Sequence, residues 1–168
     1  MHIFSLWLIP KEQKYKDFSR IIKVLARKNL APKFEPHVTL IGGILTNKKK
    51  AIKNTKQLAS CMLPFSLNLM GIGYENTNHK ALFVNCGRNK SFLNAHKKAR
   101  EIFKHQEECS PHISLIYGIY SEESKKEMIK EIKRYPKSLT FNSISLFNTE
   151  DKNEEKWYKV AEFKLQKG

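Results

Sequence analysis

The sequence predicts an α+β fold of two similar lobes, each an antiparallel sheet with helices on its outer face, with a central cleft between the lobes. The main observation is a repeat: residues 36–43 and 111–118 lie 75 positions apart, and five of the eight residues are identical. In addition, the pattern helix–strand–helix–strand–strand occurs twice after a first strand. We therefore expect residues 1–168 to form a single domain with a two-fold pseudo-repeat.

The first half of the chain opens with a predicted strand over residues 2–9. A helix is expected over residues 12–29, because four apolar side chains recur there at helical spacing: Phe18, Ile21, Ile22 and Leu25. The first copy of the repeat is an apolar, β-branched strand that ends at the glycine pair 42–43. A lysine-rich helix over 46–60 follows. A hairpin of an alternating strand over 65–72, a polar turn at 73–80 and a partner strand at 81–86 completes this half.

The second half repeats this order of elements. We expect a helix at 91–106, the second copy of the repeat, a helix at about 122–134 and strands at 139–147 and 156–165. The helix that follows the second copy is supported by a capping-box pattern from Ser124 to Glu127. No long linker separates the halves, so they should pack together.

The composition is that of a folded protein, because 40% of the 168 residues are hydrophobic and 28% are charged. Lys and Arg number 31 against 16 Asp and Glu, which gives a formal net charge of +15. This surplus favours a phosphate-bearing partner, although a lysine-rich solvated surface would give the same value. The three cysteines match no zinc or redox spacing, which indicates reduced thiols and a cytoplasmic location. The apolar run near the N-terminus is too short to span a membrane.

Each copy of the repeat carries a histidine and a hydroxyl residue two positions apart. Residues i and i+2 of a strand point to the same face. His37 and Thr39 therefore share one face of their strand, and His112 and Ser114 share one face of theirs. We expect the two pairs to face one cleft.

Two neighbouring imidazoles suit the cleavage of a phosphodiester. One ring removes a proton from the attacking water and the other protonates the departing oxygen, which predicts a bell-shaped pH dependence. The hydroxyls of Thr39 and Ser114 are suited to bind the non-bridging phosphate oxygens. This chemistry needs no metal and no other cofactor, and residue types alone do not decide which histidine is the base.

Other interpretations of these residues stay open. A metal site could use the two repeat histidines, with Glu35 nearby, but no third ligand has a paired spacing. Cys109 could be a nucleophile, although a small buried thiol is the commoner role. The other histidines lie in no matching frame, and His96 and His105 are interpreted as residues of a helix surface.

The paired His-x-Thr/Ser strands resemble those of the 2H phosphoesterase superfamily. Within it, three stretches are similar to the cyclic phosphodiesterase family of plants and yeast: residues 5–10 (SLWLIP), 34–40 (FEPHVTL) and 112–117 (HISLIY). The resemblance covers most of the chain. It implies that His37 and His112 are the acid–base pair and that Thr39 and Ser114 hold the phosphate.

The resemblance also implies that Trp7 and Tyr117 flank the base or ring of the substrate, with core packing as the alternative for Trp7. The expected activity is the opening of cyclic phosphates, either ADP-ribose 1″,2″-cyclic phosphate, a by-product of tRNA splicing, or 2′,3′-cyclic nucleotides. The expected partner is therefore a small nucleotide with a cyclic phosphate. We further expect a monomer that does not bind membranes.

Two alternative functions stay open at this point. An RNA end-processing enzyme of the same superfamily, acting on 2′,3′-cyclic termini or 2′-5′ linkages, would use the basic surface as a track for the polymer. A non-catalytic nucleotide- or RNA-binding module would not need a matched acid and base.

Overall fold

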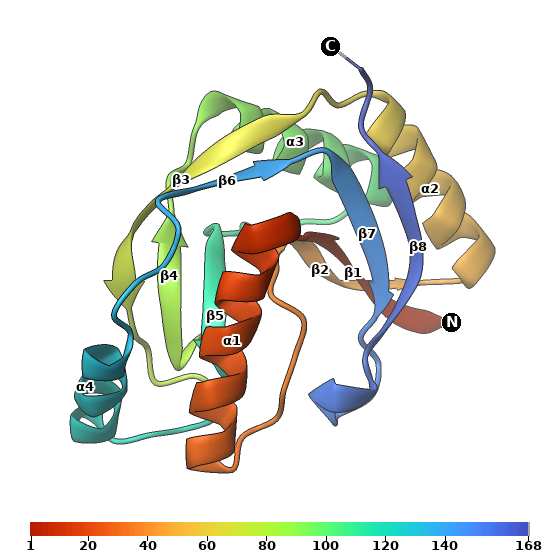
Figure 1. The fold of residues 1–168 in the computed structure, drawn as a ribbon. Coiled ribbons are helices and arrows are strands. Elements are labelled where there is room, and N and C mark those ends of the chain that lie inside the picture. The colour runs from red at the N-terminus through yellow and green to blue at the C-terminus, as the bar shows by residue number, and fades with distance from the viewer. Residues whose placement is uncertain (168) are drawn as a thin grey trace.

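The computed structural model describes residues 1–167 and contains four helices and eight strands (Figure 1). In chain order they are β1 (His2–Leu8), α1 (Glu12–Asn29), β2 (Val38–Thr46), α2 (Lys48–Ser60), β3 (Phe65–Gly73), β4 (Leu82–Cys86), α3 (Lys90–Phe103), β5 (His112–Ile116), α4 (Glu122–Glu131), β6 (Ser138–Phe141), β7 (Ser143–Asn148) and β8 (Tyr158–Lys164). Two short 3-10 turns, η1 (Asn78–Lys80) and η2 (Glu154–Lys156), lie in the β3–β4 and β7–β8 loops. The predicted α+β class is confirmed.

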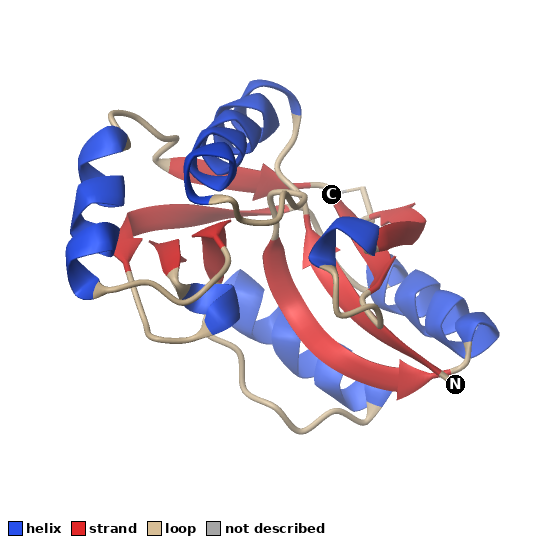
Figure 2. Ribbon diagram, turned by 90° about the horizontal axis from the view of Figure 1, so that it is seen from below, coloured by secondary structure: helices blue, strands red, loops and turns tan. Residues whose placement is uncertain are grey.

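The eight strands form one curled sheet in the order β6-β3-β4-β5-β2-β1-β7-β8. Figure 2 shows this curl from below, with the helices at the periphery. The sheet consists of two halves of four strands each, and every pairing in it is antiparallel. The halves meet where β5 pairs with β2, and the register of that junction consists of the pair Val38–Ile113. The two copies of the sequence repeat therefore lie side by side at the centre of the sheet.

The helices connect the halves, because each one that precedes a repeat strand packs on the other repeat strand. Helix α1 precedes β2 and packs on β5, while α3 precedes β5 and packs on β2. The predicted stripe of α1 is buried at Phe18, Ile22 and Leu25. Helix α4 begins at Glu122, where it was expected, and ends at Glu131, three residues before its expected end. Its N-cap is Ser121, whose side chain accepts a hydrogen bond from the backbone N–H of Ser124.

Two strand predictions need correction. The strand expected over 139–147 is split at Asn142 into β6, which pairs with β3, and β7, which pairs with β1. The segment thus crosses from one half of the sheet to the other, and the prediction of a single strand did not anticipate this crossing. The strand of the first repeat does not end at its glycine pair but continues as β2 to Thr46. Gly42 and Gly43 lie opposite the single residue Ser5, a β-bulge that uses the positive φ of +66° at Gly43.

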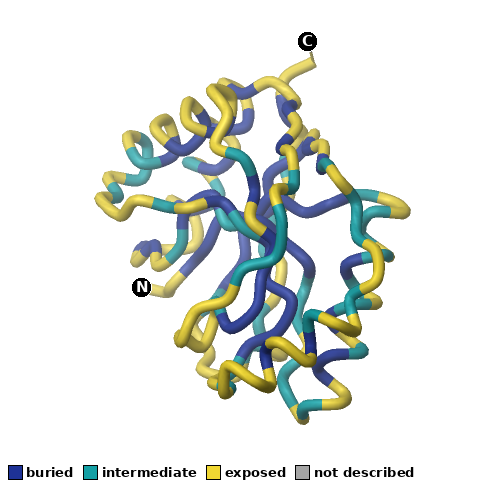
Figure 3. Tube along the Cα trace, turned by 90° about the vertical axis from the view of Figure 1, so that its left-hand side faces the viewer, coloured by how far each residue is buried: buried dark blue, intermediate teal, exposed yellow. Residues whose placement is uncertain are grey.

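A continuous hydrophobic core runs through both halves of the sheet and under the helices. Figure 3 shows the buried backbone concentrated in the central strands, with exposed segments on the outer turns of the helices. The largest fully buried side chains include Phe4, Phe18, Phe92 and Phe141. Within residues 1–167, none of the helices combines the length and the apolar character that a membrane span requires.

Adjacent residues of α3 allow a matched test of this core. Phe92 is 0% exposed and Leu93 is 41% exposed. We expect Phe92→Ala to lower the free energy of unfolding by about 3–5 kcal/mol, because it removes a buried ring and leaves a cavity. Leu93→Ala should change it by less than about 0.5 kcal/mol, as is usual for a surface position. Urea titration followed by circular dichroism measures both, and equal effects of the two substitutions would contradict this description of the core.

Candidate active site

The junction of β2 and β5 places the two histidine–hydroxyl pairs against each other. In an antiparallel pair, one step along the first strand corresponds to one step backwards along the second. From the register at the centre of the junction, His37 therefore lies opposite Ser114, and Thr39 lies opposite His112. Directly opposite residues share a face of the sheet. All four side chains line one cleft of about 440 Å³.

Both histidine rings are oriented in the same way by the backbone. His37 donates a hydrogen bond from Nδ1 to the carbonyl oxygen of Glu35 (2.6 Å), and His112 donates from Nδ1 to the carbonyl oxygen of Ser110 (2.8 Å). A carbonyl oxygen can only accept, so the proton of each neutral ring is on Nδ1. Nε2 of each ring is then the atom able to take or give a proton in the cleft.

Burial makes both rings hard to protonate. His37 is 7% exposed, and the loss of hydration lowers its pKa to about 3, with a further lowering by the nearby His112 and His79. Burial also lowers the pKa of His112, which is partly exposed. A phosphate anion between the rings would act in the opposite direction, because a negative charge favours the protonated imidazole.

The two hydroxyls are equivalent in sequence but not in their hydrogen bonds. Ser114 donates from Oγ to the backbone carbonyl oxygen of His79 in η1 (2.8 Å). Thr39 accepts a hydrogen bond from Sγ of Cys109 at its backbone carbonyl oxygen (3.3 Å). Its hydroxyl makes no hydrogen bond to another protein group within residues 1–167 and lines the cleft. Thr39 can therefore donate to a phosphate oxygen directly, whereas Ser114 must first exchange its bond to η1.

The two aromatic residues predicted to flank the substrate are packed tightly. Trp7 is 2% exposed, with His37 stacked at 3.6 Å and Phe147 stacked at 4.1 Å between ring centroids. The indole of Trp7 is therefore in contact with the His37 ring. Tyr117 is also buried and stacks on Phe34 at 3.7 Å. Both residues line the cleft, so a contact with the substrate stays a prediction for each of them.

Two histidines interpreted as helix-surface residues lie in the cleft instead. His96 is 4% exposed and donates from Nδ1 to the carbonyl oxygen of Leu40 (2.9 Å). His105 follows the end of α3, and both rings line the cleft. Strands β2 and β5 pair only around Val38 and Ile113, and α3 packs on β2, so the backbone carbonyl of Leu40 is available to the His96 ring. The spacing of His96 from Phe92, four residues before it on the apolar stripe, could have indicated this.

The alternative chemistries considered for the sequence are not favoured by the contacts. Burial raises the pKa of the Cys109 thiol to about 11, so it stays protonated and is a poor nucleophile. The Glu35 carboxylate accepts a hydrogen bond from the Tyr15 hydroxyl (2.8 Å). In the described part of the chain, no group of three or more His, Cys, Asp or Glu side chains is arranged to hold a metal ion.

Two residues of the cleft were not recognised in the sequence as functional. His79 belongs to η1, and Trp157 directly follows η2, so they come from loops of opposite halves of the sheet. The structure brings them together, with their ring centroids 5.7 Å apart, beside Tyr117. The only signal in the sequence is the presence of a large aromatic residue at the end of a charged turn.

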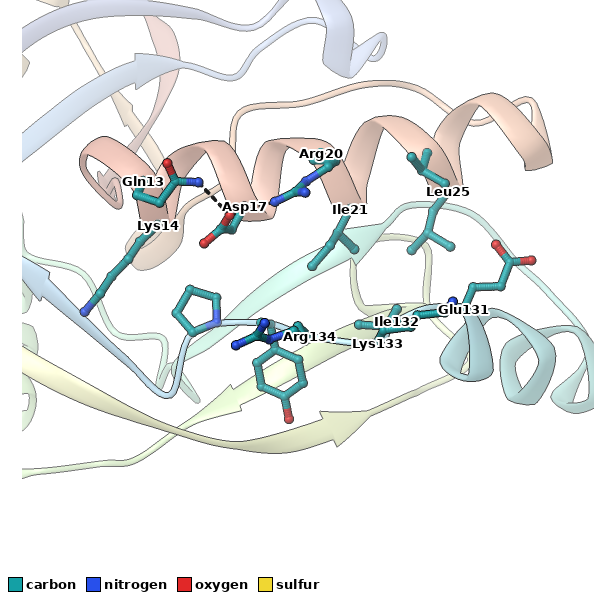
Figure 4. A pocket seen from close by; sticks show the side chains of 13 residues that line it. Gln13, Lys14, Asp17, Arg20, Ile21, Leu25, Glu131, Ile132, Lys133 and Arg134 are labelled. Atoms are coloured by element: carbon teal, nitrogen blue, oxygen red, sulfur yellow. Dashed lines mark hydrogen bonds and ion pairs between the residues drawn. The ribbon is translucent and has the colours of Figure 1, made fainter.

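A larger cavity of about 790 Å³ lies between α1 and residues 131–136 (Figure 4). Ile21 and Leu25 of α1 point towards Ile132 across it, and Arg20 at its rim is paired with Asp17 at 2.8 Å. No histidine, cysteine, serine or threonine is among the residues that line it. The histidine and hydroxyl side chains that could act on a phosphate ester therefore line the smaller cleft at the strand junction, not this cavity.

Comparison with known proteins gives a consistent assignment. Residues 1–165 match the model of the family described as cyclic phosphodiesterase-like protein. The cyclic phosphodiesterase of Arabidopsis thaliana is 23% identical over 172 residues, which cover 95% of this chain and 93% of the relative. The predicted resemblance is thus confirmed at the level of the family.

Solved structures show the same fold at low sequence identity. The protein TT0787 of Thermus thermophilus superposes with a TM-score of 0.69 and 16% identity, covering 97% of both chains. LigT of Escherichia coli in its apo form gives a TM-score of 0.64 and 13% identity, covering 98% of both chains. Because the family model spans nearly the whole sequence, the chain belongs to the cyclic phosphodiesterase-like family of 2H phosphoesterases and is a phosphodiesterase.

Proposed function

We propose that this protein hydrolyses a cyclic phosphate ester of a small nucleotide, with His37 and His112 as its acid–base pair. The observation that carries the proposal is the β2–β5 junction, at which two imidazoles and two hydroxyls share one face of the sheet and line one cleft. No step of the reaction requires a metal ion. Candidate substrates are ADP-ribose 1″,2″-cyclic phosphate and 2′,3′-cyclic nucleotides.

We assign the base to His37 and the acid to His112. Nε2 of His37 accepts a proton from a water molecule as the water oxygen bonds to phosphorus. The ester bond from phosphorus to one ribose oxygen breaks, and His112 delivers the proton on its Nε2 to that oxygen. His37 is the more buried ring and stays unprotonated, while the partly exposed His112 can regain a proton from solvent.

The negative charge that develops on phosphorus oxygens needs hydrogen-bond donors. The free hydroxyl of Thr39 is the first donor, and Ser114 becomes the second when it releases the carbonyl of His79. Trp7 keeps the His37 ring in place through its stacking contact and acts as a positioning residue.

The named relatives support a nucleotide substrate. LigT of Escherichia coli, a protein of similar fold, has been solved in complexes with 3′-AMP and with ATP. For this chain, we propose a small nucleotide as the partner of the cleft and a monomer as the active form. The free thiols Cys61, Cys86 and Cys109 fit the expected cytoplasmic location.

RNA end processing is a second candidate because cations lie near the cleft, in what we call the basic groove. Lys23, Lys33 and Lys159 line this groove, which shares Trp7 and Trp157 with the cleft. Three glutamates also line it, so its basic character is confined to the end at Lys23 and Lys33. An adjoining depression adds Arg27. A single-stranded RNA with a cyclic phosphate at its end could follow these cations away from the reacting group.

Replacing either repeat histidine should remove most of the activity. We expect His37→Ala and His112→Ala each to lower kcat by about 10²–10⁴-fold, the usual contribution of a general acid or base. His2→Ala is the matched control, because His2 is exposed and pairs with Glu150 outside the cleft. Phosphorus NMR of reactions with 2′,3′-cyclic nucleotides and ADP-ribose cyclic phosphate measures turnover and shows which oxygen leaves. Near wild-type turnover in either cleft variant would refute the proposed mechanism.

The pH dependence should be one-sided rather than the bell expected from two ordinary histidines. Protonation of His37 would lower the rate only near its pKa of about 3. Loss of the proton from His112, whose pKa is below its ordinary value of 6.5, lowers kcat/KM as the pH rises. In the complex, the phosphate charge favours protonated His112, so the fall in kcat should occur at higher pH than the fall in kcat/KM. A rise of kcat/KM between about pH 5 and 7 would contradict the assignment of base and acid.

The salt dependence of kcat/KM distinguishes the two candidate substrates, an RNA end and a small cyclic nucleotide. If RNA follows the basic groove, kcat/KM for an oligonucleotide ending in a 2′,3′-cyclic phosphate should fall about tenfold or more between about 50 and 200 mM salt, because bound cations are released. The value for a cyclic mononucleotide should change little. The double variant Lys23→Ala/Lys33→Ala should reduce the salt effect, while Lys56→Ala on α2, outside the groove, should not. Equal salt responses for both substrates would exclude the RNA track.

A further inference from the structure

The indole of Trp157 is the large aromatic ring of the cleft that remains suited to stacking. Its ring neighbours are tilted against it, at 59° for Trp7, 60° for Tyr117 and 47° for His79. None of them lies parallel on its surface, in contrast to the two rings stacked on Trp7. The indole is nevertheless held in place, because Nε1 donates to the carbonyl oxygen of Asp151 (2.7 Å). A planar ligand could stack on such a fixed ring with little loss of side-chain freedom.

Beside Trp157, the imidazole of His79 is exposed but has a defined orientation. Nε2 lies 3.0 Å from Oε1 of Glu154, and the same oxygen accepts a hydrogen bond from Nδ2 of Asn78 (3.1 Å). The His79 side chain is 57% exposed and that of Glu154 only 13%. A carboxylate is an acceptor, so Nε2 is the donor of this bond. In the neutral ring, Nδ1 is therefore a hydrogen-bond acceptor available to a ligand.

The two side chains lie in the same cleft as the proposed acid–base pair. They belong to loops from opposite halves of the sheet, and the pair of Glu154 with His79 and Asn78 connects these loops. An aromatic face next to a fixed acceptor is the arrangement that recognises a nucleobase by stacking and by its hydrogen-bonding edge. An acceptor selects an exocyclic amino group over a carbonyl oxygen at the same ring position.

We propose that Trp157 and His79 form a nucleobase subsite, in which the base stacks on Trp157 and its exocyclic amino group donates to Nδ1 of His79. The proposal rests on the proposed function and narrows its substrate class to nucleotides whose base carries an exocyclic amino group, which disfavours uracil. Glu154 is a positioning residue in this subsite, because it sets the orientation and the tautomer of His79.

Two substrates that differ at one ring position provide the test. Cytidine and uridine 2′,3′-cyclic phosphates differ by an amino group or a carbonyl oxygen at C4. At about pH 8, wild-type kcat/KM should favour the cytidine ester about fivefold, as one neutral hydrogen bond allows. His79→Phe keeps an aromatic ring and should bring this ratio close to one, through KM rather than kcat.

Three further variants separate recognition from general damage. Glu154→Gln should reduce the cytidine preference while His79 itself is kept, and Trp157→Leu should raise KM for both esters alike. His2→Phe is the matched control, because His2 also pairs with a glutamate but lies outside the cleft, and it should leave the ratio unchanged. Circular dichroism and urea titration verify that each variant is folded.

Each outcome either supports the subsite or overturns it. A wild-type ratio near one, or a ratio that survives His79→Phe, overturns the subsite. If neither these esters nor ADP-ribose 1″,2″-cyclic phosphate is hydrolysed, the proposed function fails, and calorimetry with 3′-CMP and 3′-UMP then tests the subsite independently. Tighter binding of 3′-CMP that is lost in His79→Phe would support the subsite in that case, and equal affinities would refute it.

Discussion

The structure depends on one short contact between two strands. Strands β2 and β5 join the halves of the sheet at a register centred on Val38 and Ile113, and they diverge beyond it. Because the residues on either side alternate in direction, this register alone determines that all four hydroxyl and imidazole side chains emerge on one face. A shift of the register by one residue would turn one pair into the core and leave the other without its counterpart.

Local backbone structure and burial explain why both imidazoles have a fixed orientation and a lowered pKa. Each ring is fixed by the carbonyl of the residue two positions before it, with Pro36 or Pro111 between the two, so the local backbone restricts both in the same way. Burial then removes the hydration that would stabilise a positive charge. A bound phosphate restores that stabilisation, so substrate charge and catalytic protonation are coupled. The two histidines differ in their surroundings, however. His37 is stacked on Trp7, whereas His112 is partly exposed and is not stacked on that ring.

Much of this was predictable, and the errors have specific causes. Helix α1 and the repeat strands follow from apolar spacing, which is a local property. The split at Asn142 was missed because residues on both sides are equally apolar, and only their different partners, β3 and β1, separate them. His96 was misplaced since a histidine on an apolar stripe can be buried only if a backbone acceptor, here Leu40, lies opposite.

The sequence by itself determined the α+β class, the doubled motif and the four side chains that we propose as the acid–base site, because each follows from the spacing of a few neighbouring residues. Tertiary structure decided what no local pattern contains: the stacking that makes Trp7 a support, the bond that occupies Ser114, and the meeting of His79 with Trp157. These contacts join residues far apart in the chain. Their geometry follows from how the two halves pack, and packing is a property of the whole core rather than of any one segment.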